Sequence, residues 1–179
     1  MALKFGPWSI AETEVFYASQ LSFGLVNTKP IVPGHVLLIT KRVAARFSDL
    51  TADEVNDLFA SAQRVAGVIE SHFEAQSMTI TIQDGPAAGQ TVPHVHIHVI
   101  PRRVGDWANN DDIYPEIDES EAQMAVMKAG DEAISKLRSK KKGPDAEERV
   151  ARTQQQMAEE ALMLRKYFPD NCVPFNLEQ

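Results

Sequence analysis

Cysteine is nearly absent from this chain of 179 residues, in which Cys172 is the only one. A single cysteine excludes an internal disulfide and a cysteine-rich zinc site. Long apolar runs are also missing, since no segment reaches the roughly 18 consecutive apolar residues of a membrane span and the opening MALKFGPW lacks the apolar run of a signal peptide. We therefore expect a cytoplasmic protein, with the nucleus also open to it, that has no membrane partner.

Positive charge is scarce as well. The chain has 18 Lys and Arg against 25 Asp and Glu, which gives a formal net charge of −7. This balance argues against a broad nucleic-acid surface, although a small anion such as a nucleotide needs only a local cluster of donors. With 44% hydrophobic and 24% charged residues and no internal repeat, the chain suits one globular domain with a sizeable core.

The first two thirds of the chain predict strands around one helix. Runs of β-branched and aromatic residues predict strands at 14–18, 21–27, 35–40 and 78–83. Thr51 and Glu54 form a capping box, and apolar residues then recur at helical spacing as far as Phe73, which predicts an amphipathic helix. The order of these elements indicates an α+β fold, an antiparallel sheet with one long helix packed on it.

The stretch most informative about function alternates histidine with β-branched residues over 94–99. On an extended chain, His94, His96 and His98 share one face, about 6.6 Å apart for a rise of roughly 3.3 Å per residue. We expect Pro93 to precede this strand and Pro101 to close it. Three imidazoles on one face predict a binding site for one small group.

That group is a phosphate or a metal ion. Neutral imidazole is a nucleophile at pH 7, and neighbouring rings can hold phosphate oxygens and protonate a leaving group, which suits a phosphoanhydride. The small-residue loop 84–90 before the strand offers backbone amides to phosphate oxygens. A zinc shell of histidines stays open as an alternative, although alternate residues of one straight strand converge poorly on one ion. A purely structural stripe is the third interpretation, and His35 could join either kind of site.

Beyond Arg103 the composition changes. Residues 111–121 are acidic, 140–144 are a basic breaker, and 122–137 are weakly helical, so we expect 106–146 to be partly mobile. Apolar residues at helical spacing predict a last helix over 145–168, ending at Pro169.

The run from Gln83 to Arg102 resembles the signature of the histidine triad (HIT) superfamily, in which three histidines alternate with apolar residues. Within it the chain is most similar to the fragile histidine triad (Fhit) branch of dinucleoside polyphosphate hydrolases. His98 stands where the uridylyltransferase branch has glutamine, and Gln83 where the Hint-like phosphoramidases tend to have asparagine. The resemblance covers about residues 3–115, with a weaker echo at 164–168, and implies a HIT-like α+β domain, usually a homodimer.

The resemblance also implies an activity and the residues that carry it. The family cleaves diadenosine 5',5'''-triphosphate to AMP and ADP through a nucleotidyl-histidine intermediate. By position, His96 is the nucleophile, His98 contacts the phosphate or the leaving oxygen, and His94 and His35 orient the site. The substrate-binding positions are Asn27 at the ribose, Gln83 near the scissile bridge, Gln90 and Thr91 on the phosphate side, and Phe5 at the adenine. As an exposed site residue, His96 should be replaceable by alanine without loss of the fold.

These observations divide the chain into a HIT domain at 1–115, a mobile acidic and basic insertion at 116–146, and a helix with a tail at 147–179 that completes the domain. We expect no obligatory cofactor and no protein-held metal, with Mg²⁺ or Mn²⁺ arriving on the substrate phosphates. The expected partners are a dinucleoside polyphosphate and a second copy of the chain. Two other functions stay open: a nucleotide-binding signalling module with slow turnover, and a Hint-like nucleoside phosphoramidase.

Overall fold

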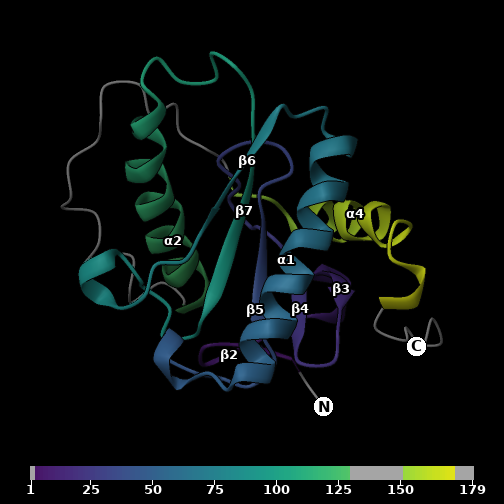
Figure 1. The fold of residues 1–179 in the computed structure, drawn as a ribbon, viewed down its shortest axis with the longest axis vertical. Coiled ribbons are helices and arrows are strands. Elements are labelled where there is room, and N and C mark those ends of the chain that lie inside the picture. The colour runs from purple at the N-terminus through teal and green to yellow at the C-terminus, as the bar shows by residue number, and fades with distance from the viewer. Residues whose placement is uncertain (1–2, 130–150, 172–179) are drawn as a thin grey trace.

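The computed structural model describes residues 3–129 and 151–171, which fold around a five-stranded antiparallel sheet (Figure 1). The strands lie in the order β3-β4-β5-β7-β6. Their bounds are Val15–Ala18 for β3, Ser22–Val26 for β4, Val36–Thr40 for β5, Ser77–Thr81 for β6 and His96–Arg102 for β7. The helices are α1 (Ala52–His72), α2 (Ile113–Ala129) and α4 (Gln154–Arg165). The predicted α+β arrangement is confirmed.

Helix α1 covers one face of the sheet, as its sequence predicts. The Thr51 hydroxyl accepts from the Glu54 N–H and the Glu54 carboxylate accepts from the Thr51 N–H, so the capping box satisfies two amides at the helix start. Behind the cap, Leu58, Val65 and Ile69 are buried against the sheet in the main apolar cluster. This cluster also takes in one face of β5 and β7 and the inner residues of α4.

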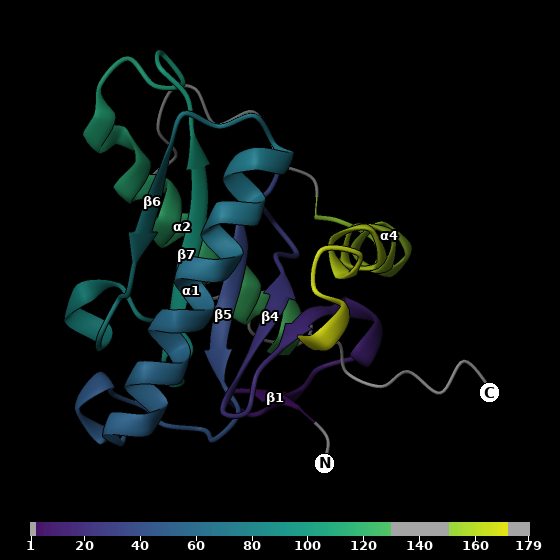
Figure 2. The same ribbon diagram turned by 45° about the vertical axis from the view of Figure 1, so that its right-hand side comes forward.

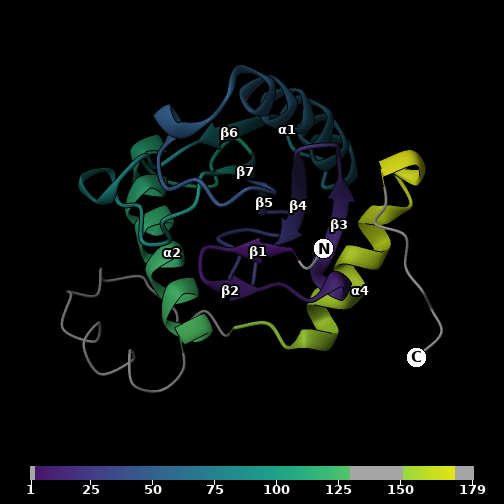
Figure 3. The same ribbon diagram turned by 90° about the horizontal axis from the view of Figure 1, so that it is seen from below.

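The opposite face of the sheet is covered by pieces that sequence periodicity does not reveal. Two strands of two residues each, β1 (Lys4–Phe5) and β2 (Trp8–Ser9), form a small hairpin there. Seen from below, α1 lies on one side of the sheet, the hairpin lies on the other, and α2 and α4 flank it (Figure 3). Figure 2 shows α2 behind the sheet when α1 is in front. Strands of two residues carry no alternation, so the hairpin was not predicted.

Both predicted ends of the histidine strand are wrong. The prediction began the histidine strand at His94 and closed it at Pro101, whereas β7 starts at His96 and runs to Arg102. The ladder with β5 ends at Val99, so Pro101 faces no β5 carbonyl that needs its missing N–H, and β7 continues through it.

The later helices also differ from their predicted bounds. Helix α2 begins at Ile113, earlier than the weakly helical stretch 122–137, because Ile113 and Ile117 bury themselves against Ile100 of the sheet. Helix α4 begins after its own cap, Thr153, rather than at residue 145. It ends at Arg165, ahead of Pro169.

The domain divisions at 115/116 and 146/147 stay predictions. The first falls within α2. The second lies outside the described residues, as do residues 130–146 of the predicted mobile segment and residues 172–179 of the tail, which include Cys172. Among the helices that the structure describes, none is long and apolar enough to cross a membrane.

Candidate active site

The two faces of β7 separate apolar from ionisable side chains. Ile97 and Val99 lie in the α1 cluster, whereas His96 and His98 lie opposite Ile39 and Leu37 of β5, on the face that carries the hairpin. The predicted alternation therefore holds for these two histidines. All four histidines of the predicted site are buried, with exposed fractions of 0 to 1%.

His35 and Asn27 reach the site from neighbouring strands. They directly precede β5 and directly follow β4, at adjoining strand ends. Nδ1 of His35 accepts from the Ile31 N–H at 3.2 Å and lies 3.4 Å from Nδ2 of Asn27. Since Nδ1 is an acceptor, the ring proton of neutral His35 sits on Nε2, which donates to Nδ1 of His98 at 3.0 Å.

The same reasoning places the proton of His98. Because its Nδ1 accepts from His35, the proton of neutral His98 sits on Nε2, and Nε2 is buried with no hydrogen-bond partner among the described residues. Burial above all, with the charges of His96 and His35, holds the pKa of His98 well below its ordinary value. His98 therefore presents a neutral N–H donor to the site at pH 7.

His94 lies on the same side of the sheet but just before β7 rather than in it. Its Nδ1 accepts from the Gly6 N–H of the hairpin turn at 3.0 Å. Its Nε2 lies 3.1 Å from both the Thr40 hydroxyl and the Arg42 carbonyl, to which it donates. Burial lowers the pKa of His94 to about 4. This neutral ring links the hairpin to the end of β5 by hydrogen bonds. The backbone carbonyl of His94 orients His96.

His96 has its nucleophilic nitrogen set by that carbonyl. Its Nδ1 lies 2.7 Å from the oxygen of His94, which can only accept, so the proton of neutral His96 sits on Nδ1 and Nε2 carries the lone pair. The ring centroid of His98 is 5.0 Å away. A lone pair and an N–H donor therefore stand side by side, which is the pair that attack on a phosphate requires.

The expectation that His96 is exposed is wrong. Its side chain is 1% exposed because the Phe5 ring covers it edge-on, with centroids 5.0 Å apart at 84°. The family resemblance places Phe5 at the adenine, and the structure brings its ring into contact with His94 and His96. Replacing His96 by alanine would leave a cavity, so a conservative variant is the better test.

Gln83 reaches the site from the other side of β7. Thr81 of β6 is paired with His98, and continuing this antiparallel register by two residues places Gln83 opposite His96. Gln83 is 9% exposed, its Nε2 donates to Oδ1 of Asp118 on α2, and its Oε1 is buried with no hydrogen-bond partner in the described part of the chain. Gly89, with φ of +94°, leaves no room for a Cβ against this pair.

The remaining predicted residues lie in or after the loop 84–90. Gln90 accepts from the Gly85 N–H at 2.8 Å and donates to the Ala45 carbonyl at 3.0 Å, so its amide closes the loop internally. Asp84 anchors the loop start, since Arg46 donates to it at 3.0 and 3.1 Å and lowers the pKa of its carboxyl. Thr91 is exposed at the loop end. The structure thus gathers the four histidines, Asn27, Phe5 and Gln83, while Gln90 turns toward the loop itself.

Two contributors were missed by sequence reasoning. The Gly6 N–H is a backbone group, and no side-chain pattern announces it. Asp118 stands in an acidic stretch interpreted as a mobile segment. The buried spacing of Ile113 and Ile117 was the available signal that this stretch forms a helix packed on the site.

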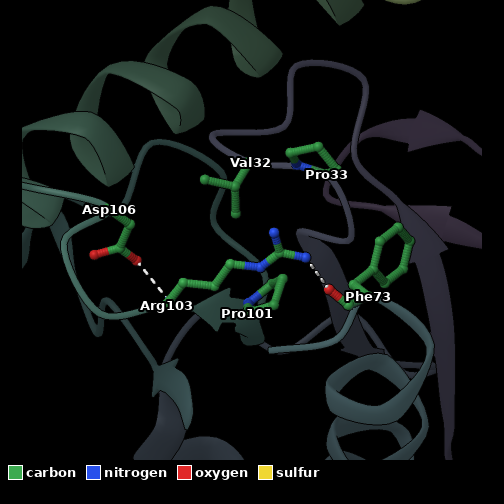
Figure 4. Close-up of a pocket in the computed structure, with 6 residues that line it drawn as sticks. All are labelled: Val32, Pro33, Phe73, Pro101, Arg103 and Asp106. Carbon is green, nitrogen blue, oxygen red and sulfur yellow. Dashed lines mark hydrogen bonds between the residues drawn. The ribbon is translucent and has the colours of Figure 1, made fainter. Parts of the chain in front are cut away.

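A hollow elsewhere on the surface lacks these features. It lies at the C-terminal end of β7 and is lined by Val32, Pro33, Phe73, Pro101, Arg103 and Asp106 (Figure 4). The Arg103 guanidinium donates to the Phe73 carbonyl at 2.6 Å, and the Arg103 N–H donates to Asp106 at 3.0 Å. Each of its two charged side chains thus binds a backbone group, and no histidine lines it.

Two of the four histidines keep no ring nitrogen for a metal ion. Both ring nitrogens of His35 and of His94 are engaged in hydrogen bonds within the protein. Among the residues in 3–129 and 151–171, no group of three or more His, Cys, Asp or Glu side chains is placed to hold a metal ion. Among the histidines, the site offers one lone pair, on Nε2 of His96, beside one N–H donor, on Nε2 of His98.

This fold and this histidine cluster define an α+β domain with a buried histidine site, and comparison with known proteins gives its family. Residues 10–105 match the HIT domain. The chain belongs to the HIT family, in its Fhit branch.

Three relatives support this assignment. A bifunctional bis(5'-adenosyl)-triphosphatase/adenylylsulfatase of Arabidopsis thaliana is 46% identical over 164 residues, 92% of this chain and 83% of that protein. A bis(5'-adenosyl)-triphosphatase of Dictyostelium discoideum is 55% identical over 114 residues, 64% of this chain and 76% of that protein. An asymmetrical bis(5'-nucleosyl)-tetraphosphatase of Schizosaccharomyces pombe is 44% identical over 165 residues, 88% and 90% of the two chains.

The crystal structure of a Plasmodium falciparum diadenosine triphosphate hydrolase in complex with cyclomarin A has a TM-score of 0.68 at 28% identity. The match covers 96% of this chain and 87% of that one. The HIT-like fold is therefore confirmed.

Proposed function

We propose that this chain is a bis(5'-adenosyl)-triphosphatase, which cleaves diadenosine 5',5'''-triphosphate to AMP and ADP. The relatives named above carry this or a closely related activity, and this chain matches them over most of their length. The observation that carries the mechanism is the set of hydrogen bonds that puts a lone pair on Nε2 of His96 and an N–H on Nε2 of His98.

In the first step Nε2 of His96 attacks the α-phosphorus, and the bond from that phosphorus to the bridging oxygen breaks. ADP leaves with the bridging oxygen, and AMP stays bound to His96 as a phosphoimidazole. The positive charge on that ring is stabilised by the Nδ1–H bond to the His94 carbonyl. The N–H of His98 binds the phosphoryl or bridging oxygen, where negative charge grows in the transition state.

In the second step a water molecule attacks the same phosphorus and the P–N bond breaks. The proton that the water loses passes to solvent, AMP is released, and the lone pair returns to His96. His35 and His94 act by orienting their neighbours, since each has both ring nitrogens in fixed hydrogen bonds. After the second step the protein has returned to its starting state.

The substrate runs across the sheet from β4 toward β6. Asn27 contacts a ribose hydroxyl, Phe5 borders the adenine, and Gln83 lies at the scissile bridge, opposite His96. Gln90 and Thr91 act on the phosphate side through the loop, Gln90 by holding it closed.

The reaction as proposed needs no obligatory cofactor. Mg²⁺ or Mn²⁺ enters with the substrate phosphates, where oxygen ligands suit it. Turnover should therefore persist in part when excess EDTA removes divalent cations. Complete loss that zinc restores would favour the metalloenzyme alternative instead.

We also propose that the chain forms a homodimer through β6. This strand is an edge of the sheet, paired with β7 on one side, and Ile80 on it is 46% exposed. Light scattering across a range of protein concentrations tests this, and a monomer throughout would refute it.

We place the protein in the cytoplasm, with access to the nucleus, and fluorescence imaging of the tagged chain checks that location.

An adenylylsulfatase activity is a second candidate, favoured by the Arabidopsis relative that carries both activities in one chain. The same attack by His96 on an adenylyl phosphorus would release sulfate in place of ADP. Adenylyl sulfate therefore belongs in the same assay.

The test is to incubate the purified chain with diadenosine triphosphate and to separate the products by chromatography, with and without EDTA. Equal AMP and ADP are expected, with an adenylylated enzyme trapped by rapid alkaline quench, in which the P–N bond survives, in the wild type and absent in His96→Asn. Absence of products would overturn the proposed function, and products from a well-folded His96→Asn enzyme at the wild-type rate would overturn the mechanism.

A further inference from the structure

Asp118 places a carboxylate against the phosphate side of the site. Its Oδ1 accepts from Nε2 of Gln83, and the close fit of Gly89 against both groups leaves little room between them and the loop. Anion-binding sites usually present donors, so an acidic side chain here opposes the charge of the substrate. Nothing in the proposed hydrolysis requires it.

The placement of Asp118 is fixed by the packing of α2. Ile113 and Ile117 are buried against Ile100, which follows the site histidines on β7. The Ser120 hydroxyl donates to the Lys29 carbonyl at 2.9 Å and is 1% exposed, which ties the helix to the segment after Asn27. Asp118 lies between Ile117 and Ser120, so the helix holds it at the site edge.

The direction of the substrate brings the leaving phosphates toward this carboxylate. Asn27 lies on the β4 side of His96 and Gln83 on the β6 side. With the ribose at Asn27 and the scissile bridge at Gln83, the phosphates beyond the bridge continue on the Asp118 side. A longer polyphosphate adds its extra ionised phosphate in the part of the substrate that approaches Asp118.

We propose that Asp118 is a specificity-determining residue that disfavours longer, more highly charged polyphosphates and so selects the triphosphate over the tetraphosphate. This inference rests on the proposed function. One N–H of Gln83 is held by Asp118, and the other remains for the bridging oxygen, so a triphosphate keeps its contact. A tetraphosphate brings one more negative charge close to a fixed one.

Asp118→Asn separates charge from hydrogen bonding, because an asparagine Oδ1 still accepts from Gln83. We expect this variant to raise kcat/KM for diadenosine tetraphosphate relative to the triphosphate by about three- to tenfold. Because Asp118 is exposed to solvent, the change should shrink as salt shortens the screening length from about 10 Å near 0.1 M to about 3 Å near 1 M. The matched control is Asp111→Asn, which removes an exposed charge from the turn before α2 and should leave the ratio unchanged.

Binding gives the same comparison without turnover. In a His96→Asn background, calorimetry with the two dinucleotides should show the Asp118→Asn change as tighter tetraphosphate binding relative to the triphosphate. A ratio that Asp118→Asn leaves unchanged, in a variant with wild-type thermal stability, would overturn the inference while hydrolysis by the wild type still stands. A wild type that neither cleaves nor binds either dinucleotide would overturn the proposed function and this inference with it.

Discussion

The two faces of β7 carry opposite kinds of residue at alternate positions. Ile97 and Val99 are buried among aliphatic side chains under α1, whereas His96 and His98 are equally buried among polar partners on the other face. Burying apolar surface stabilises a fold, but burying a ring nitrogen costs free energy unless it is hydrogen-bonded. Neighbouring residues of one strand therefore serve different purposes: Ile97 and Val99, the aliphatic face, stabilise the fold, and His96 and His98, the chemical face, serve the reaction. The histidines of the chemical face can be buried only because they are hydrogen-bonded.

The largest effect on activity should come from His96→Asn, which changes a side chain of the chemical face only. Asparagine keeps a side-chain N–H near the place of Nδ1 and so retains a donor for the His94 carbonyl, but it has no nucleophilic nitrogen. We expect kcat for diadenosine triphosphate to fall by about a thousandfold or more. The free energy of unfolding should change by about 1 kcal/mol.

Steady-state kinetics and chemical denaturation measure the two effects. A fall in stability as large as the fall in activity would show that the two faces are not separable.

Ile97→Ala should have the opposite effects, a large loss of stability with little loss of activity. Removing a fully buried isoleucine under α1 is expected to lower the free energy of unfolding by about 2 to 5 kcal/mol, because the cavity cannot fully collapse. The folded fraction should keep kcat within about twofold, since no ring of the site is touched. Urea denaturation measures this, with Val104→Ala, at a position 89% exposed, as the control that should cost little. If Ile97→Ala lost activity without losing stability, the division of β7 into two faces would be wrong.

The alternation of residues 94–99 predicted this division because side-chain period two is a property of any extended backbone. It did not predict that the strand starts only at His96, since Val95 donates to the Ala44 carbonyl rather than to a ladder partner. Nor did it predict burial of the site, because the hairpin that brings Phe5 over His96 is held by contacts between distant parts of the chain. The capped helix, the sheet and the histidine cluster follow from local pattern and family resemblance. The position of Asp118 depends on how α2 packs, which no local pattern shows.

Lowering the pH should reduce the free energy of unfolding through the buried histidines and not through the aliphatic residues under α1. The pKa of His94 is about 4 in the folded protein, below the value of about 6.5 in an unfolded chain. Between these values the unfolded state binds more protons, so stability is full above about pH 6.5 and declines as the pH falls toward 4. For His94 alone the loss is on the order of 3 kcal/mol, and His98 adds to it in the same direction.

Thermal unfolding at pH 7.5, 6 and 5 tests this, with Ile97→Ala expected to show the same slope as the wild type and His94→Asn a shallower one. A wild-type stability that is flat from pH 7.5 to 5 would contradict the buried neutral histidines.

The smallest expected effect tests a contact that joins the two faces. The Glu54 carboxylate accepts from Nε and Nη2 of Arg42 at 2.7 and 2.6 Å, and the Arg42 carbonyl accepts from His94. The hydrogen bond from Arg42 lowers the pKa of Glu54 to about 2, so its contribution is present above about pH 4.3 and is lost as the pH falls through 2.

Glu54→Gln should lower the free energy of unfolding by about 1 kcal/mol, because the cap and the ion pair both weaken. The rate should fall by only about twofold, because hydrogen bonds from the Thr40 hydroxyl and from His94 hold the Arg42 carbonyl independently of the Arg42 side chain. Asp53→Asn, at the neighbouring exposed position of the same helical turn, is the matched control. Equal effects of the two variants at pH 7 would mean that the link between α1 and His94 carries no free energy, and that the helix face and the histidine face of the sheet are independent.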